Sequence, residues 1–410
     1  MSATVATQNR LAELRERFRP HFDTIAAGAV ERDRTGELPY HEIAALARDG
    51  FGAVRVPESH GGAGATLPEL FELFVDLAAA DSNIAQALRA HFAFVEDRLV
   101  AEPGPGRDVW LKRFVDGELV GNSWTEVGAV KVGDVITKVT PGGDGGFRIN
   151  GTKYYSTGSI FADWLDTYAE RTDTGKRVIA AVNRHQEGVA LEDDWDGFGQ
   201  RTTGTGTSTF TDAVVEEENL IDFDTRFKYQ TAFYQQVLLA VLAGSVRGAE
   251  ADFGREVKNR TRTFSHAAAN VAAKDPQLLQ VIGEVSSAAF VATAAVRRVS
   301  DALQEAYESA LALRRGEITE QDDEAANDRA ELASAQAQVA LTPLAVDAIS
   351  RAFDALAASG TSVKKGLDRH WRNARTAGNH NPRVFKARLI GDLVVNGADL
   401  PRVWAIGASK

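Results

Sequence analysis

The pattern of apolar positions divides the chain into three zones. Residues 1–118 carry apolar side chains at helical spacing, as in LAELRERFRPHFDTIAAGAVERD. Residues 119–225 contain short runs rich in β-branched and aromatic residues, each bounded by Gly, Asp or Asn, and such runs predict strands. Residues 226–410 return to long apolar helical segments. We therefore predict an α+β protein with an N-terminal helical domain, a middle β-domain built as a small barrel or sandwich, and a C-terminal helical bundle.

Local signals refine these zones. Thr66, Pro68 and Glu69 form a helix-start pattern after a glycine-rich loop, RVPESHGGAGAT. The sequence GGDGG at 142–146 predicts a tight turn between two strands. Pro343 falls inside a long helical segment, and we expect it to kink or break that helix.

The C-terminal segments are long and apolar on more than one face. The segment that begins LLQVIGEVSSAAF has a helical pattern over nearly forty residues. Such helices carry more apolar surface than one bundle can bury, so we expect a homo-oligomer.

Composition narrows the class of partner. The net charge of −11 argues against nucleic acid or an anionic membrane as the main partner. No run of about 18 apolar residues is present, which predicts no membrane span. The chain has no cysteine, which excludes disulfides and thiolate metal sites, and no signal-peptide pattern. We expect a cytoplasmic protein.

Two polar stretches in the β-zone are candidates for a ligand site. GNSWTEVGAVKVGD (121–134) places Asn122, Thr125 and the flat ring of Trp124 at the end of a strand. NGTKYYSTGSIFADW (150–164) clusters hydroxyl groups, among them Ser156 and Thr157. A planar heteroaromatic ligand needs hydrogen bonds at its edge and stacking on its face. The alternative is an ordinary strand and turn with a core tryptophan.

Other motifs are absent or weak. The eight histidines include no HExxH or comparable metal-ligand spacing, so we predict no metal. No GxSxG hydrolase motif occurs. His91 lies on a probable helix, where a histidine is more often structural than catalytic.

A basic segment lies near the end of this acidic chain. Residues 364–388 hold eight Lys or Arg and one acid, a net charge of 8 − 1 = +7. Arginine forks match phosphate oxygens, so this segment is a candidate phosphate site. The alternatives are a solvated helix face and ion pairs with distant carboxylates. NRTRTFSH (259–266) offers a second candidate.

Taken in order, these stretches resemble the acyl-CoA dehydrogenase superfamily over almost the whole chain. RVPESHGGAGAT is similar to its glycine-rich loop, SWTEVGA and INGTKYYSTGSIFADW to its flavin-binding segments, and NRTRTF to a site of flavin-phosphate or dimer-contact arginines. The resemblance implies an N-terminal helical domain (1–118), a middle β-barrel domain (119–225) and a C-terminal four-helix bundle (226–410). It also implies a homotetramer and a flavin at the junction of the three domains.

One family feature is missing. The dehydrogenases need a carboxylate to take a proton alpha to a thioester. Here the late segment reads RTAGNHNPR, and the first bundle helix has Gln235 and Gln236 where an acid would be sought. Glutamine does not accept a proton with the required strength.

HWRNARTAGNHNP instead resembles the flavin-dependent monooxygenase branch of the superfamily, which includes the dibenzothiophene monooxygenases. This branch takes reduced FMN (FMNH2) from a separate flavin reductase and holds O2 as a flavin C4a-hydroperoxide. By this resemblance, Asn122, Ser156 and two histidines, His91 and His380, lie near the flavin ring or the peroxide. The residues expected to bind FMN are Trp124, Thr125, Ser156, Thr157 and, at the phosphate, Arg262 from a neighbouring subunit, with Lys365, Arg369 or Arg372 as alternatives.

Three hypotheses follow. The first is a two-component monooxygenase that oxygenates a hydrophobic or heteroaromatic small molecule at S, N or C. The second is an FAD-dependent acyl-CoA dehydrogenase or oxidase with a relocated base. The third is a non-catalytic flavin- or lipid-binding relative.

Overall fold

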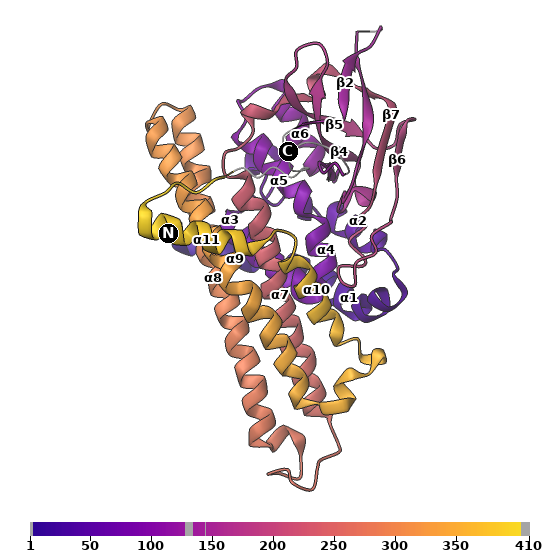
Figure 1. Ribbon diagram of the computed structural model, residues 1–410, viewed down its shortest axis with the longest axis vertical. Coiled ribbons are helices and arrows are strands. Elements are labelled where there is room, and N and C mark those ends of the chain that lie inside the picture. The colour runs from indigo at the N-terminus through magenta and orange to yellow at the C-terminus, as the bar shows by residue number, and fades with distance from the viewer. Residues whose placement is uncertain (1–2, 128–133, 144, 403–410) are drawn as a thin grey trace.

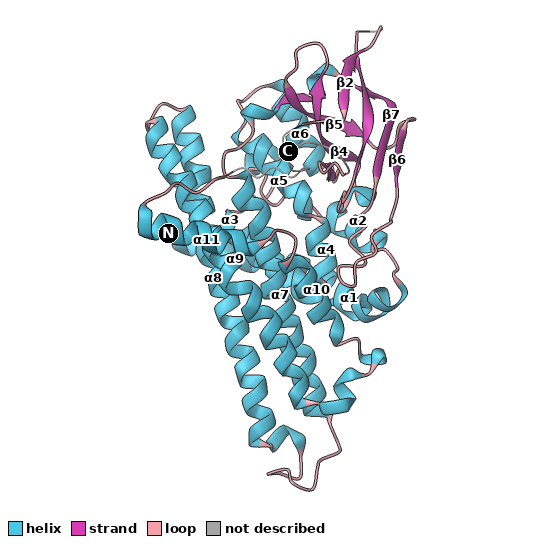
Figure 2. Cartoon of the chain, in the orientation of Figure 1, coloured by secondary structure: helices cyan, strands magenta, loops and turns pink. Residues whose placement is uncertain are grey.

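The computed structural model describes residues 3–127, 134–143 and 145–402. The N-terminal part is helical (Figures 1 and 2). The predicted start of α3 is confirmed: the Thr66 hydroxyl accepts from the Glu69 backbone N–H, and the Glu69 carboxylate accepts from the Thr66 N–H at 2.6 Å. The helices of this part are α1 (Ala3–Thr35), α2 (Tyr40–Arg48), α3 (Leu67–Ala80), α4 (Ser82–Ala87), α5 (Arg89–Val100) and α6 (Pro105–Val115).

The middle part is an eight-stranded sheet whose strands follow the order β6-β7-β3-β2-β4-β5-β8, with β1 paired in parallel to β4. The turn predicted at 142–146 joins β2 to β3, with the Gly142 N–H donating to the Gly146 carbonyl at 2.7 Å. The strands are β1 (Val120–Ser123), β2 (Lys138–Pro141), β3 (Phe147–Lys153), β4 (Trp164–Arg171), β5 (Arg177–Asn183), β6 (Val189–Leu191), β7 (Ser208–Val215) and β8 (Leu220–Asp222).

The sheet folds over its own apolar core. Side chains from β3 and β7, such as Ile149 and Phe210, pack against side chains from β4 and β5, such as Leu165 and Val182. No ladder joins β6 to β8 among the described strands, so of the two predicted forms, barrel or sandwich, the sheet is not a barrel closed by hydrogen bonds. Packing of the two halves, rather than hydrogen-bonded closure, buries the core.

The C-terminal part consists of long helices that run side by side (Figure 1). Helix α7 spans Gln230–Asn259, and α8, predicted at nearly forty residues, spans Pro276–Arg314, 39 residues. Helix α9 (Glu320–Ala352) continues through Pro343, so of the two predicted alternatives the break is excluded and the kink stays a prediction. Helix α9 packs along its length on α7 and α8, and this packing offsets the hydrogen bond that proline removes. The shorter α10 (Asp368–Gly378) packs on α7 and α9, and α11 (Arg383–Asn396) packs on α9.

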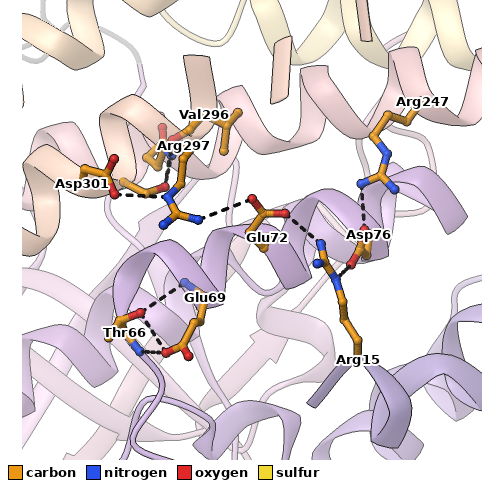
Figure 3. A network of polar contacts seen from close by, with 11 residues as sticks. Arg15, Thr66, Glu69, Glu72, Asp76, Arg247, Val296, Arg297 and Asp301 are labelled. Carbon is orange, nitrogen blue, oxygen red and sulfur yellow. Dashed lines mark hydrogen bonds and ion pairs between the residues drawn. The ribbon is translucent and has the colours of Figure 1, made fainter. Parts of the chain in front are cut away.

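Ion pairs join the N-terminal helices to the bundle. Arg15 on α1 contacts Asp76 and Glu72 on α3, both at 2.7 Å. Asp76 also accepts from Arg247 of α7 at 2.7 Å, and Glu72 lies 3.9 Å from Arg297 of α8 (Figure 3). Helix α3 thus lies between two parts of the fold and fixes their relative position.

Helix α8 exposes an apolar face. Phe290 is 76% exposed, and Leu279 and Val291 are each 50% exposed. By length and apolarity α8 would also pass as a membrane span, a test that core helices pass too. This face is where the predicted homo-oligomer would bury apolar surface.

Candidate active site

The end of β1 presents an unsatisfied polar group at the junction of the three parts. Asn122 is buried, its carbonyl accepts from the Ser159 hydroxyl at 2.7 Å, and its side-chain Oδ1 has no hydrogen-bond partner among the described residues. A buried acceptor without a partner is costly and calls for a ligand donor. Residues 128–133 of the GNSWTEVGAVKVGD stretch lie outside the described residues.

Trp124 forms a rigid wall beside Asn122. Its indole N–H donates to Asp166 at 2.8 Å, and its ring stacks on Tyr168 at 5.7 Å between centroids. The guanidinium of Arg226 lies 5.2 Å from the Trp124 ring centre. The next residue, Thr125, accepts from the Tyr154 N–H through its carbonyl at 2.8 Å, which ties the first polar stretch to the second.

The second stretch supplies a buried chain of hydroxyl groups. Ser156 lies 3.4 Å from Ser123, and Thr157 accepts from Thr205 at 2.9 Å. Gly158 adopts φ +78°, and a Cβ there would lie 2.0 Å from the Ala87 carbonyl oxygen. Glycine therefore allows this loop to dock on α4, which brings Ser156 and Asn122 to the same junction.

His91 has a structural role, contrary to the expectation of a peroxide contact. It is 1% exposed, its Nε2 lies 2.8 Å from the Gly52 carbonyl, and the Val120 N–H donates to its Nδ1 at 3.2 Å. Both ring nitrogens are therefore occupied by backbone groups. Burial lowers the pKa of His91 to about 4, so the ring is neutral at pH 7. Histidine here joins α5 to the start of the sheet.

His380 differs from His91 because it is exposed. The protein around the ring nevertheless desolvates it, and together with the positive charge of Arg89 this lowers the pKa of His380 to about 3. The ring is therefore neutral at pH 7. Its contact with Asn381 weakly opposes this shift.

The three cations of the basic segment that were candidates for the flavin phosphate pair with distant carboxylates, as the ion-pair alternative predicted. Lys365 pairs with Glu256, Arg369 lies 2.5 Å from Asp252, and Arg372 lies 2.6 Å from Asp33. The same Asp252 contacts the first histidine of the segment, His370, at 2.9 Å. These cations hold α10 against α7 and α1, so the expectation that one of them binds the flavin phosphate is not supported.

Arg262 lies apart from this junction. It is exposed in the connection between α7 and α8, at the end of the bundle remote from the sheet (Figure 1). Within one chain it does not meet Asn122 or Ser156, so only a neighbouring subunit could use it at the site.

The sequence did not single out Arg89 and Tyr234, which the structure brings to the same place. Arg89 is 7% exposed, and its guanidinium lies 5.4 Å from the Tyr234 ring centre. The Tyr234 ring in turn meets Trp124 edge-on at 5.8 Å. An arginine inside the apolar run ALRAHFAF was the available signal.

The buried carboxylates next to Trp124 and Tyr234 are held in ion pairs. Asp166 lies 3.0 Å from Arg226, and Asp97 lies 2.5 Å from Arg98 and 3.9 Å from Arg226. Gln236 donates to the Val296 carbonyl at 2.7 Å. In the described part of the chain, no free carboxylate therefore stands beside these rings to act as a base, and no group of three metal-ligating side chains occurs.

A recess in the surface lies apart from this junction. Its volume is about 460 Å³, and it opens between the end of α1, the 196–201 loop and the start of α10. Asp33 and Arg372 line it, whereas Asn122, Ser156 and His380 do not. Because none of the unpartnered buried groups faces it, we do not assign the active site there.

Two models of one protein family match most of the chain. The family model for the acyl-CoA dehydrogenase N-terminal domain matches residues 9–118, and that for the C-terminal domain matches residues 236–383. The chain belongs to the acyl-CoA dehydrogenase family.

Within this family the chain is similar to flavin-dependent monooxygenases, which confirms the predicted branch. It is 29% identical over 393 residues to a dibenzothiophene monooxygenase of Rhodococcus erythropolis, with 90% of each chain covered. It is 28% identical over 380 residues to a probable FMNH2-dependent monooxygenase, SfnC, of Pseudomonas putida, covering 90% of this chain and 92% of that one. The crystal structure of FMN-bound TdsC from Paenibacillus sp. A11-2 superposes with a TM-score of 0.84 at 28% identity, covering 96% of this chain and 98% of that one.

Proposed function

We propose that this chain is the oxygenase component of a two-component, FMN-dependent monooxygenase, which receives FMNH2 from a separate flavin reductase. The observation that carries the proposal is the set of groups at the junction. Asn122 offers an unpartnered acceptor and His380 a neutral ring, while the neighbouring carboxylates are engaged in ion pairs. A site without a free base is suited to oxygen transfer and unsuited to removal of an α proton.

The residues present fit a flavin. The edge of an isoalloxazine ring carries N–H donors and carbonyl acceptors, which complement the Asn122 amide and the hydroxyls of Ser156 and Thr157. Trp124 and Thr125 would flank the ring. FMN, once bound and reduced, supplies the two electrons that activate O2.

The protein's own groups would control water and protons. The wall formed by Trp124, Tyr168 and Tyr234 excludes water from one side of the junction. A neutral His380 can donate one ring N–H and accept at the other nitrogen, so it can deliver a proton to an oxygen atom and recover it from solvent. Asn122 and Ser156 would orient the reacting oxygen.

We further propose a homotetramer in which copies of α8 cover the exposed face of Phe290 and Val291. In such an assembly Arg262 of one copy would reach the FMN phosphate of another. The exposure of Arg262 and its lack of a nearby site within its own chain support this arrangement.

The test is oxygen-isotope incorporation. Purified protein is mixed with FMNH2, ¹⁸O2 and a panel of thioethers, amines and heteroaromatic compounds, and products are analysed by mass spectrometry. The proposal expects one ¹⁸O atom in at least one product and tighter binding of FMN than of FAD. Oxidation of acyl-CoA thioesters with bound FAD, and no oxygenated product, would contradict it.

A further inference from the structure

Four of the five buried arginines in the described chain have a carboxylate partner, and the fifth, Arg89, has none. Arg32, Arg55 and Arg226 each lie within 3.0 Å of a carboxylate oxygen, and Arg369 lies 2.5 Å from Asp252. Arg89 is 7% exposed, its Nε is buried without a hydrogen-bond partner, and no ion pair joins its guanidinium to the described residues. It is therefore the buried cation whose charge the protein leaves uncompensated.

Burial without a carboxylate partner lowers the pKa of Arg89. Desolvation lowers its pKa to about 10, and the only opposing influence is Tyr234. The guanidinium therefore keeps its charge at neutral pH. A buried charge without a counter-ion destabilises the folded protein because it has lost its hydration. We therefore expect the charge of Arg89 to be compensated in another state, when an anion is bound.

The neighbours of Arg89 include a second polar group without a partner, the Tyr234 hydroxyl. The Tyr234 hydroxyl is inaccessible and also lacks a hydrogen-bond partner among the described residues. Burial raises the pKa of Tyr234, so the hydroxyl stays a neutral donor. His380 feels the charge of Arg89, and Trp124 contacts the Tyr234 ring at 5.8 Å. Arg89 thus stands among the groups assigned to oxygen transfer, with a second free donor next to it.

We propose that Arg89 and Tyr234 form an anion subsite that binds the substrate through an oxyanion group, a sulfinate, sulfonate or carboxylate. Two guanidinium N–H groups match two oxygens of such a group, and the tyrosine hydroxyl adds a third donor. This inference rests on the proposed function, because the bound anion is a substrate only if the protein is an oxygenase. It narrows the expected substrates from apolar molecules in general to molecules that carry an anionic group.

The anion subsite can be tested without turnover. Protein loaded with oxidised FMN and no reductant is titrated with methanesulfinate, benzenesulfinate, benzoate and the uncharged methyl phenyl sulfone, following the flavin absorbance and the heat of binding. We expect at least one anion to bind, and Arg89→Met to weaken it at least about tenfold while leaving the sulfone unchanged. Tyr234→Phe should weaken the anion by about three- to tenfold.

Two matched variants separate binding from folding. Arg113 stacks on Trp110 and Trp164 at 4.4 and 4.1 Å, so Arg113→Met removes a cation elsewhere and should leave anion affinity unchanged. Arg226→Met breaks a buried ion pair and should lower the Tm, whereas Arg89→Met removes an uncompensated charge and should keep or raise it.

Three results would overturn the subsite. The first is that none of the anions binds saturably to the wild-type protein. The second is a loss of FMN affinity in Arg89→Met with anion affinity intact, which would assign Arg89 to the flavin. The third is a fall in Tm for Arg89→Met as large as for Arg226→Met, which would make Arg89 structural. Anion binding without any oxygenated product would instead contradict the proposed function and leave the subsite standing.

Discussion

The indole nitrogen of Trp124 lies 2.8 Å from Oδ1 of Asp166, a buried carboxylate whose other oxygen lies 3.0 Å from Arg226. The site wall is thereby attached to an ion pair inside the protein. The ring that would flank a flavin is consequently fixed in place before any ligand binds.

Asp166→Leu should destabilise the protein strongly. The substitution leaves the buried Arg226 without its closest carboxylate and the Trp124 N–H without an acceptor, so we expect a loss of about 3–5 kcal/mol. Thermal unfolding followed by circular dichroism measures it. Asp173→Leu, which removes an exposed partner of Arg171, should change the Tm little.

Protonation of His91 should account for part of the loss of folding stability at low pH. Its pKa is lowered to about 4 in the fold by burial, against about 6.5 in an unfolded chain, so protonation favours unfolding. Stability is complete above about pH 6.5 and falls as the pH drops toward about 4, by up to about 1.4 kcal/mol per pH unit for this residue. The Tm of His91→Gln, which keeps one donor and one acceptor, should depend less steeply on pH. An equal slope in wild type and variant would contradict this, and the exposed His41→Gln is the control.

His380→Ala should impair oxygen transfer while FMN still binds. Loss of a proton-transferring group lowers kcat by about 10²–10⁴-fold, with FMN affinity nearly unchanged. Product yield and hydrogen peroxide release from added FMNH2 measure the effect, and peroxide should rise as product falls. Exposed His266, in the connection from α7 to α8, provides the control in His266→Ala. Wild-type yield in His380→Ala would remove His380 from the reaction.

The two kinds of basic residue should respond differently. Arg372→Met breaks contacts with Asp33 and Asp368 and should lower the Tm without changing FMN affinity. Arg262→Met should leave the Tm in place and weaken FMN binding about tenfold, because it removes a phosphate contact between subunits. Fluorescence titration with FMN distinguishes the two. If riboflavin, which lacks the phosphate, loses as much affinity as FMN in Arg262→Met, the phosphate assignment is wrong.

Phe290→Lys should disrupt assembly. The side chain is 76% exposed in the single chain, so the substitution costs the monomer little, within about 0.5 kcal/mol. A charge buried between copies would destabilise their interface, and native mass spectrometry should show dissociation. Val109→Lys, at a 48% exposed apolar residue of α6, should leave the assembly unchanged. A monomeric wild type would contradict the tetramer.

Local signals in the sequence determined most of the secondary structure. Thr66 and Glu69 cap α3, and apolar spacing predicted the 39 residues of α8, because capping and amphipathic burial depend on residues a few positions apart. At Pro343 the sequence left open a kink or a break of the helix, and tertiary packing keeps α9 helical through it. Sequence also showed that the acid of the dehydrogenases is missing, since Gln235 and Gln236 can be read directly.

Tertiary structure alone decided which polar groups are free. Arg369 meets Asp252 and Arg372 meets Asp33, partners more than a hundred positions away, so a segment that resembles a phosphate site is a structural one. His91 has both nitrogens occupied by backbone, whereas Arg89, two residues earlier, has no carboxylate partner in the described chain. Sequence states which charges a chain carries, but only the docking of helices, sheet and bundle determines which of them are neutralised and which remain for a ligand.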